Sequence, residues 1–421
     1  QWSHWSDLHH GRAAGERRGA LSCGTRLRVA DGSPGAGTAT VDVAIVGGGA
    51  NGLYLACLLA HRGVSVVVLE QRTAVADRPR AFGIHPAALA ALDAVGVGDA
   101  VRAEALTLDA GSFTTAAGRT VSVSFAPPAH PGPVVLDQRI VERMLERRLA
   151  TLAPGALRRG AVVRAVHDTG ESVSVGVASG GPVVSRYVVL ADGVNGELAE
   201  SVFGPLRGVG PARWYAMAEA DAGGGADTDA GAGPDDRTAR LLAAHDGIVE
   251  SFPVPGARRR WVVWRASDAP IAADEFRMLV RDRANAHVGR IHGPVAVFRA
   301  QSRARRRLSA GRVVLAGDGA VAVSPIGGQG LALGWSGARV LASSLVQSLE
   351  RGTPQFGPYA RAVRRLARGA QRRSAFFMVM GDPARGRDLA RRLAAVVLGA
   401  RVARPLARRL VVVDAPDLRR R

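Results

Sequence analysis

A glycine-rich turn between two short apolar runs constrains the fold of this chain more than any other feature. The segment reads VDVAIVGGGANGLYLACLLAHRGVSVVVLEQR, from Val41 to Arg72. Residues 41–46 and 64–69 suit buried strands, and residues 53–61 place leucines on one side of a helix. A strand, a turn, a helix and a second strand within about 30 residues make one βαβ unit. The segment therefore predicts a Rossmann-like α/β sheet.

The glycines of this turn follow the pattern of a dinucleotide-binding site. Gly47 permits the tight turn, Gly49 leaves room for a pyrophosphate, and Gly52 lets the helix pack on the strand. Backbone N–H groups at the start of the helix attract phosphate. Glu70 follows eighteen residues after Gly52, where a carboxylate accepts hydrogen bonds from a ribose hydroxyl pair. The turn also contributes the candidate residues Ala50 and Asn51.

Two further glycine-rich segments follow predicted strands. ADGVNG occupies residues 191–196 after a predicted strand at 183–190, and GDGAVAVSPIGGQG occupies residues 317–330 after one at 313–315. An acid and a glycine at the carboxyl end of a strand mark the edge where open α/β sheets bind ligands. The second segment holds one acid and no lysine, histidine or cysteine. Its bare N–H groups suit a flat or negatively charged group that approaches the backbone closely.

Composition limits the class of protein and its partners. The 421 residues, 47% of them apolar, are long enough for two domains of a globular protein, and no apolar run is long enough to span a bilayer. Only two cysteines occur, Cys23 and Cys57, which favours a reducing compartment, so the cytoplasm is expected. The net charge is +20, with 18 arginines against four aspartates from Arg351 to Arg421. After Phe377 this basic tail has no interleaved aromatic residues, which disfavours nucleic-acid binding. Weak contact of residues 388–413 with a membrane surface and a solvated helical face both remain open.

The order of these three segments resembles the group A flavoprotein monooxygenases, the family of para-hydroxybenzoate hydroxylase and phenol hydroxylase. The match covers roughly residues 41–349, and the family's P-x-x-G-Q-G is intact from Pro325 to Gly330. Two departures stand out. Gly319, Ala320 and Val321 replace the usual A-A-H after G-D, and Gly196 and Ala199 stand where a serine and an arginine usually follow the D-G pair.

The resemblance implies an α/β fold with an FAD-binding Rossmann-like domain of the GR2 type. A second, mixed or antiparallel β-sheet domain would bind substrate, and a helical tail would follow. The expected boundaries are a disordered extension at 1–40, an FAD-binding domain at 41–111, 134–204 and 301–350, a substrate domain at 112–133 and 205–300, and basic helices at 351–421.

The resemblance also implies the residues that hold FAD. Those after the first turn would contact the adenosine and phosphates, and those of the two later segments the ribityl chain and the flavin ring. In addition to the glycine turn and Glu70, they are Gln71, Arg72, Arg78, Arg80, Gln138, Asp192, Gly193, Asp318, Pro325, Gly328, Gly330 and Leu331. No metal site is expected.

The activity that the resemblance implies is hydroxylation of an aromatic or phenolic substrate, such as a polyketide or lipidic phenol, through a C4a-hydroperoxyflavin. NADPH or NADH would be the transient electron donor, O₂ the oxidant, and the chain a monomer or a homodimer. A flavin-dependent reductase or oxidase, or a non-catalytic flavin-binding protein anchored by its tail, remain alternatives. Candidate pocket walls are Tyr215, Phe252 and Trp264, and candidate proton acceptors are His85, Tyr215 and His245.

Overall fold

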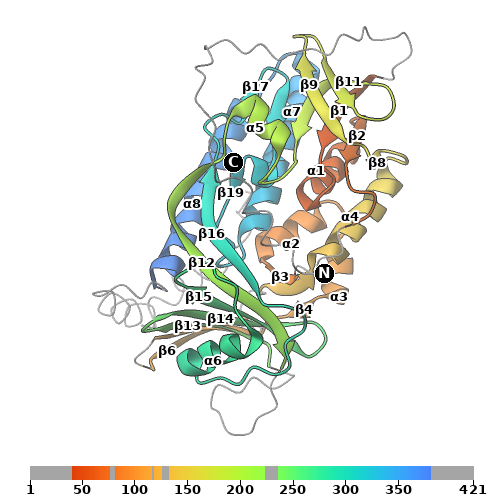
Figure 1. Ribbon diagram of the computed structural model, residues 1–421. Coiled ribbons are helices and arrows are strands. Elements are labelled where there is room, and N and C mark those ends of the chain that lie inside the picture. The colour runs from red at the N-terminus through yellow and green to blue at the C-terminus, as the bar shows by residue number, and fades with distance from the viewer. Residues whose placement is uncertain (1–39, 76–80, 116–117, 126–131, 223–235, 381–421) are drawn as a thin grey trace, which may run out of the picture.

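The computed structural model describes residues 40–75, 81–115, 118–125, 132–222 and 236–380, arranged as Figure 1 shows. The predicted extension before Thr40, the arginines Arg78 and Arg80, and the basic segment 388–413 lie outside these residues, so the expectations for them stay predictions. No helix in the described part of the chain combines the length and apolar character needed to cross a bilayer.

The first sheet is built on five parallel strands in the order β18-β11-β1-β2-β8. β17 pairs antiparallel with β18 at one edge, and β10 and β9 continue antiparallel from β11. The bounds are β1 (Thr40–Val46), β2 (Val66–Glu70), β8 (Leu157–Arg159), β9 (Val163–Asp168), β10 (Val173–Val177), β11 (Val183–Leu190), β17 (Ser309–Ala310) and β18 (Val313–Leu315). Continuous valine and leucine runs in the central strands fit a sheet that is covered on both faces.

Helices bury one side of this sheet. The first, α1, carries nine buried residues among its eleven, since it packs against the sheet and against both α4 and α7. The Trp335 indole on α7 donates from Nε1 to the Ala50 carbonyl oxygen at 3.1 Å, which fixes α7 to the start of α1. The bounds are α1 (Ala50–Ala60), α2 (Pro86–Asp93), α3 (Gly98–Glu104), α4 (Gln138–Leu152), α5 (Glu197–Phe203), α7 (Gly330–Arg351) and α8 (Gly357–Met380).

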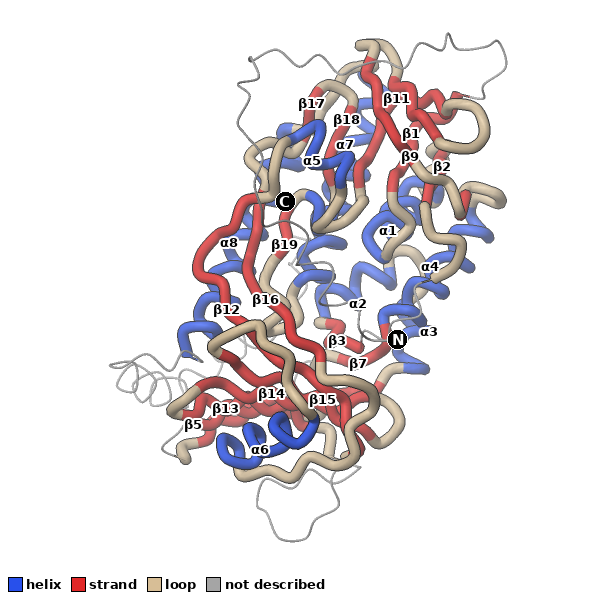
Figure 2. Tube along the Cα trace, in the orientation of Figure 1, coloured by secondary structure: helices blue, strands red, loops and turns tan. Residues whose placement is uncertain are grey.

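The second sheet has eight strands in the order β19-β16-β12-β15-β14-β13-β5-β6 and is antiparallel except for the β13–β5 pair. Figure 2 shows β5, β13, β14 and β15 at one end of the molecule beside α6, whereas the long strands β12 and β16 run from this end toward β19. The bounds are β5 (Ala110–Thr115), β6 (Thr120–Ser124), β12 (Arg207–Asp221), β13 (Thr238–Ala244), β14 (Gly247–Val254), β15 (Arg258–Arg265), α6 (Ala273–Ala284), β16 (Ala296–Ala304) and β19 (Val321–Ala322).

Alternation along the strands of the second sheet gives it two buried faces. Ala216, Val249 and Val263 pack with Phe276 and Val280 of α6 in one apolar cluster. The neighbouring residues in each strand point to the opposite face, because successive side chains of a strand alternate. That opposite face is the one that meets the rest of the protein.

A third sheet, which the sequence did not predict, joins the two larger ones. It has the order β3-β7-β4, with bounds β3 (Ala81–Ile84), β4 (Leu106–Thr107) and β7 (Val134–Asp137). The second sheet also reaches further along the chain than the proposed domain boundaries. The strand β16 runs to Ala304, because the long β12 continues to pair with it as far as Arg207. The strand β19, residues 321–322, then pairs with this end of β16.

Candidate active site

The site lies at the carboxyl edge of the parallel strands. The register places Val46 beside both Leu69 and Leu190, and Leu190 beside Leu315. The segments that follow β1, β2, β11 and β18 therefore leave the sheet at the same edge. The three glycine-rich segments predicted to form one site are brought together by this register.

The first turn is held by backbone contacts that only glycine permits. The Gly47 N–H donates to the Leu69 carbonyl oxygen at 2.8 Å, and Gly47 has φ +111°. A Cβ at Gly47 would overlap the Ala191 carbonyl, and a Cβ at Gly52 would overlap the Gly47 carbonyl oxygen. At Gly49 a Cβ would meet nothing within 4 Å. Gly47 and Gly52 thus serve packing, whereas Gly49 borders open space.

Glu70 ends β2 beneath this turn and is bonded on both carboxylate oxygens. Oε2 accepts from the Gly48 N–H at 2.6 Å, and Oε1 accepts from the N–H and Nε of Arg72 at 2.8 and 2.9 Å. Burial alone would raise the pKa of Glu70, but the hydrogen bonds from Arg72 and Gly48 hold it below its usual value. Glu70 is therefore ionised at neutral pH. Arg72, expected at the adenosine end, is here the partner of Glu70, and Gln71 between them is exposed.

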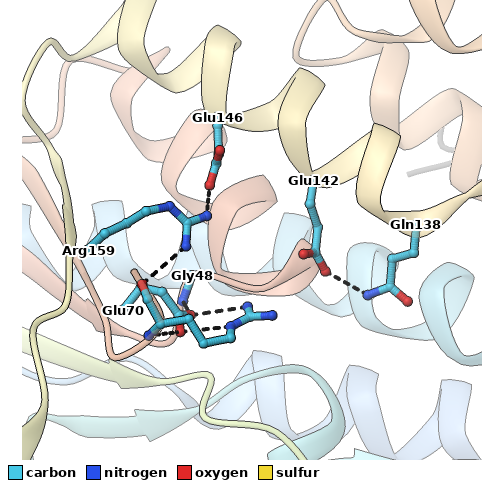
Figure 3. A network of polar contacts seen from close by, with 7 residues as sticks. Gly48, Glu70, Gln138, Glu142, Glu146 and Arg159 are labelled. Atoms are coloured by element: carbon cyan, nitrogen blue, oxygen red, sulfur yellow. Dashed lines mark hydrogen bonds and ion pairs between the residues drawn. The ribbon is translucent and has the colours of Figure 1, made fainter. Parts of the chain in front are cut away.

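A row of polar side chains on α4 faces this carboxylate. Figure 3 shows Arg159 near Gly48 and Glu70, with Glu146, Glu142 and Gln138 along the helix. Arg159 pairs with Glu146 and donates to the Arg72 carbonyl oxygen at 3.3 Å. Gln138 donates from Nε2 to Glu142 at 2.7 Å. The residues Arg159, Glu142 and Glu146 were missed from the sequence, because β8 and α4 meet β2 only through tertiary packing.

Asn51 and Asp192 tie the three segments to one another. A Cβ at Gly317 would lie 2.6 Å from Nδ2 of Asn51, so the last segment packs directly on the first. A Cβ at Gly319 would lie 3.4 Å from both Oδ1 of Asp192 and the Gly193 carbonyl oxygen, so it also packs on the second. The three predicted segments are therefore in contact with one another.

Asp192 carries an unsatisfied oxygen at this junction. Its Oδ2 accepts from the Ala199 N–H at 3.0 Å, whereas Oδ1 is buried and has no hydrogen-bond partner among the described residues. Burial raises the pKa of Asp192, and the positive charge of Arg305 opposes that rise. Arg305 is itself buried and donates from Nε to the Gly319 carbonyl oxygen at 2.9 Å. The guanidinium beside Asp192 therefore comes from the end of β16 and not from position 199.

The last segment forms a loop, residues 325–329, whose position is fixed from two sides. Nε2 of His85 lies 3.1 Å from the Gly327 carbonyl oxygen, where a protonated nitrogen donates to it. From α8, Nε of Arg373 donates to Oε1 of the buried Gln329 at 2.7 Å, and the Ser374 hydroxyl donates to the Ile326 carbonyl oxygen at 3.4 Å. Asp318 is exposed, and Leu331, in the first turn of α7, is half-buried.

A cavity of about 300 Å³ separates this loop from the second sheet. One wall consists of Pro325 to Gly328 with Gly83 and His85, and the opposite wall is the face of the second sheet that points away from α6. Most of the lining is aliphatic or aromatic, with Phe252 and Phe298 among it. A concave apolar space with a few polar groups is typical of a small-molecule site.

Two of the candidate proton acceptors lie outside this cavity. His245 is exposed at the turn between β13 and β14, since the turn lies at the end of the hairpin. Tyr215 is fully buried in the apolar cluster that includes Ile326 and Met378, and it stacks on Phe298 with ring centroids 5.8 Å apart. Trp264 does not line the cavity either, whereas His85 and Phe252 do.

Comparison with known proteins shows the family to which the chain belongs. The sequence profile described as "FAD binding domain" matches residues 40–373. The chain belongs to the FAD binding domain family. This membership confirms the predicted family, fold class and FAD cofactor, and with them an FAD-dependent oxidoreductase of the monooxygenase type.

Individual relatives of this FAD-binding chain act in more than one chemistry. It is 30% identical to the 12-dehydrotetracycline 5-monooxygenase/anhydrotetracycline 6-monooxygenase of Streptomyces rimosus, over 81% of this chain and 70% of the relative. The solved anhydrotetracycline hydroxylase from Streptomyces rimosus has a TM-score of 0.72 at 28% identity and covers 89% of this chain and 76% of its own. The dialkyldecalin synthase of Streptomyces rugosporus is 27% identical over 74% of this chain and 66% of its own.

The residues at the sheet edge fit FAD. The open space at Gly49 leaves room for a pyrophosphate, and two buried oxygens, Oδ1 of Asn51 and Oδ1 of Asp192, have no partner among the described residues. Glu70, which accepts from the Gly48 N–H, is the carboxylate that would accept hydrogen bonds from a ribose hydroxyl pair. Unsatisfied buried polar atoms beside an open glycine turn are what a site for a polar cofactor requires.

Proposed function

We propose that this protein is an FAD-dependent monooxygenase that hydroxylates an aromatic, phenolic ring with NAD(P)H as the electron donor. The observation that carries the proposal is the shared wall of the cavity. The loop at residues 325–328 lies at the edge that we assign to the cofactor, and it also lines the space in front of the second sheet. A substrate in the cavity would therefore lie directly against the segment that we assign to the flavin.

The chain's own residues would bind the cofactor and exclude water. We assign the pyrophosphate to the turn at Gly49 and the start of α1, the ribose to Glu70, and the ribityl and ring end to the surface made by Asp192, Gly193 and residues 317–330. When bound, FAD supplies the two-electron chemistry and the activation of O₂. The net reaction consumes an aromatic C–H, O₂, NAD(P)H and one proton and gives the phenol, water and NAD(P)⁺.

The cavity wall would keep the reaction dry and aligned. Aliphatic and aromatic side chains from β5, β6, β13 and β14 exclude water from the space beside the loop. The Arg373 and His85 contacts hold the backbone of that loop in place, so that its N–H groups are preorganised before a charge develops.

Isotope labelling tests this function. The purified protein is loaded with FAD, supplied with NADPH or NADH under ¹⁸O₂, and screened against phenols, naphthols and hydroxylated polycyclic aromatics. We expect one ¹⁸O atom in the product and one NAD(P)H consumed per product. Oxidation of the donor with only H₂O₂ formed would favour a flavin-dependent oxidase, and no oxidation of the donor at all would favour a non-catalytic flavin-binding protein.

A further inference from the structure

One carboxyl group stands in an apolar row that crosses the cavity face of the second sheet. The register pairs Leu241 with both Phe113 and Glu250, and pairs Glu250 with Val262. The row extends to Val121 on one side and Met217 on the other. All six residues line the cavity. Glu250 is the ionisable member of a row that is otherwise aliphatic or aromatic.

The arginines of the cavity are already neutralised by other carboxylates. Arg240 pairs with Asp236, and Arg260 pairs with Glu219. His85, on the opposite wall, contacts the Gly327 carbonyl. Oε1 of Glu250 is buried and has no hydrogen-bond partner among the described residues. A buried acceptor without a donor costs folding free energy, so a ligand that brings a donor is favoured at this point.

We propose that Glu250 binds the substrate by accepting a hydrogen bond from a ring hydroxyl and then takes the proton of that hydroxyl during hydroxylation. This inference rests on the proposed function. In the step, the phenolic O–H bond breaks, its electron pair stays on oxygen, and a new O–H bond forms on the Glu250 carboxylate. The ring gains electron density, which assists attack by an electrophilic oxygen. The proton leaves Glu250 for solvent when the product departs.

The environment of Glu250 suits this step near neutral pH. Burial raises the pKa of Glu250 to about 7. Near pH 7 the carboxylate, which accepts the hydrogen bond, and the acid, which carries the transferred proton, are therefore both populated. The other charged or titratable side chains that line the same cavity are Arg240 from β13, Arg260 from β15 and His85 from the start of α2. The charged residues of α6 face the other side of the sheet. Glu250 is therefore the group whose ionisation controls the affinity for a hydroxyl donor.

A matched pair of ligands isolates the hydrogen bond without turnover. The FAD-loaded protein is titrated calorimetrically with 2-naphthol and with 2-methoxynaphthalene, which lacks the donor. At pH 8 we expect 2-naphthol to bind at least about tenfold more tightly, as a hydrogen bond to a charged acceptor allows. The affinity should rise with pH through about 7 and then level off, because the carboxylate is the better acceptor.

Two variants and a control complete the test. Glu250→Leu should abolish the preference for 2-naphthol, and Glu250→Gln should reduce it and remove the pH dependence. Glu275→Gln on α6, an exposed glutamate on the far side of the sheet, should change neither. Unchanged preference and pH dependence in both Glu250 variants would overturn the inference.

The two proposals fail separately. If ¹⁸O enters the product at the same rate and with the same pH dependence in wild type and Glu250→Leu, the role of Glu250 is wrong and the proposed function stands. If the Glu250-dependent preference for 2-naphthol is present but no labelled product forms with any phenol, the proposed function is wrong and the binding role of Glu250 stands.

Discussion

Gly49 and Gly52 lie in the same turn, but a side chain at each would meet different surroundings. Gly52→Ala would drive a Cβ into the Gly47 carbonyl oxygen, so we expect the free energy of unfolding to fall by about 1–3 kcal/mol or more. Gly49→Ala meets nothing within 4 Å, so stability should change by less than about 1 kcal/mol while the dissociation constant for FAD rises at least tenfold. Denaturant unfolding and flavin fluorescence titration check both. Wild-type affinity in Gly49→Ala would show that the phosphates bind elsewhere.

Glu250 should make stability depend on pH. Its folded pKa is about 7 against an ordinary value of 4.5, so the folded protein holds this proton more tightly than the unfolded chain does. Its contribution to the free energy of unfolding is full below about pH 4.5 and is lost as the pH rises to about 7, by at most about 3 kcal/mol.

Glu250→Gln removes that titration. Relative to wild type, the variant should gain stability between pH 5 and pH 8, as measured by urea unfolding at each pH. A difference between the two proteins that is the same at both pH values would contradict the buried environment assigned to Glu250.

At this scale the sequence predicted what local backbone geometry decides. The packing of Gly47 and Gly52 agrees with the reason given for each from spacing alone. The roles of Glu250 and Arg305 could not be predicted in this way. Glu250 lines the cavity because its strand pairs with others across a sheet, and Arg305 lies near Asp192 because a loop folds back on it. The sequence offered one hint about Glu250, because IVESFPV, residues 248–254, places an isolated glutamate in an apolar strand.

At the scale of elements, α8 supports the loop that faces the cavity. Arg373→Met would leave the buried Oε1 of Gln329 without its donor and loosen residues 325–329. We expect a loss of about 1–2 kcal/mol in stability and a severalfold weaker affinity for FAD. Arg372→Met, at an exposed position of the same helix, is the control and should change neither quantity. Equal behaviour of the two variants would show that α8 does not hold the loop.

Elements with a strong period were predictable, and their partners were not. The apolar runs placed the strands within a few residues of β1, β2 and β11, and α1 begins at Ala50, three residues before the predicted start. Two strands of the short sheet, β3 and β4, were missed because strands of two to four residues carry no period of their own. The extension of β16 to Ala304 was missed because a long antiparallel pair ends where its partner ends.

For the whole molecule, the essential feature is that two sheets share one loop. The register of four parallel strands collects the segments that follow Val46, Leu69, Leu190 and Leu315, and the last of these segments also closes the cavity on the second sheet. The order of the motifs predicted this architecture and the cofactor. The residues of the second sheet that line the cavity are set by how its strands pair. The sequence alone therefore could not show that Phe252 lines the cavity and that Trp264 and Tyr215 do not.

Binding of FAD by the purified protein tests whether the glycine-rich edge of the parallel sheet is a flavin site. The protein is freed of ligand, titrated with FAD, and followed by the visible flavin spectrum and by quenching of flavin fluorescence. We expect one FAD per chain, with much weaker binding in Gly49→Ala and normal binding in Arg372→Met. If the correctly folded protein takes up no FAD, or if Gly49→Ala binds FAD as well as wild type does, then the edge of the sheet at Gly49 is not the flavin site.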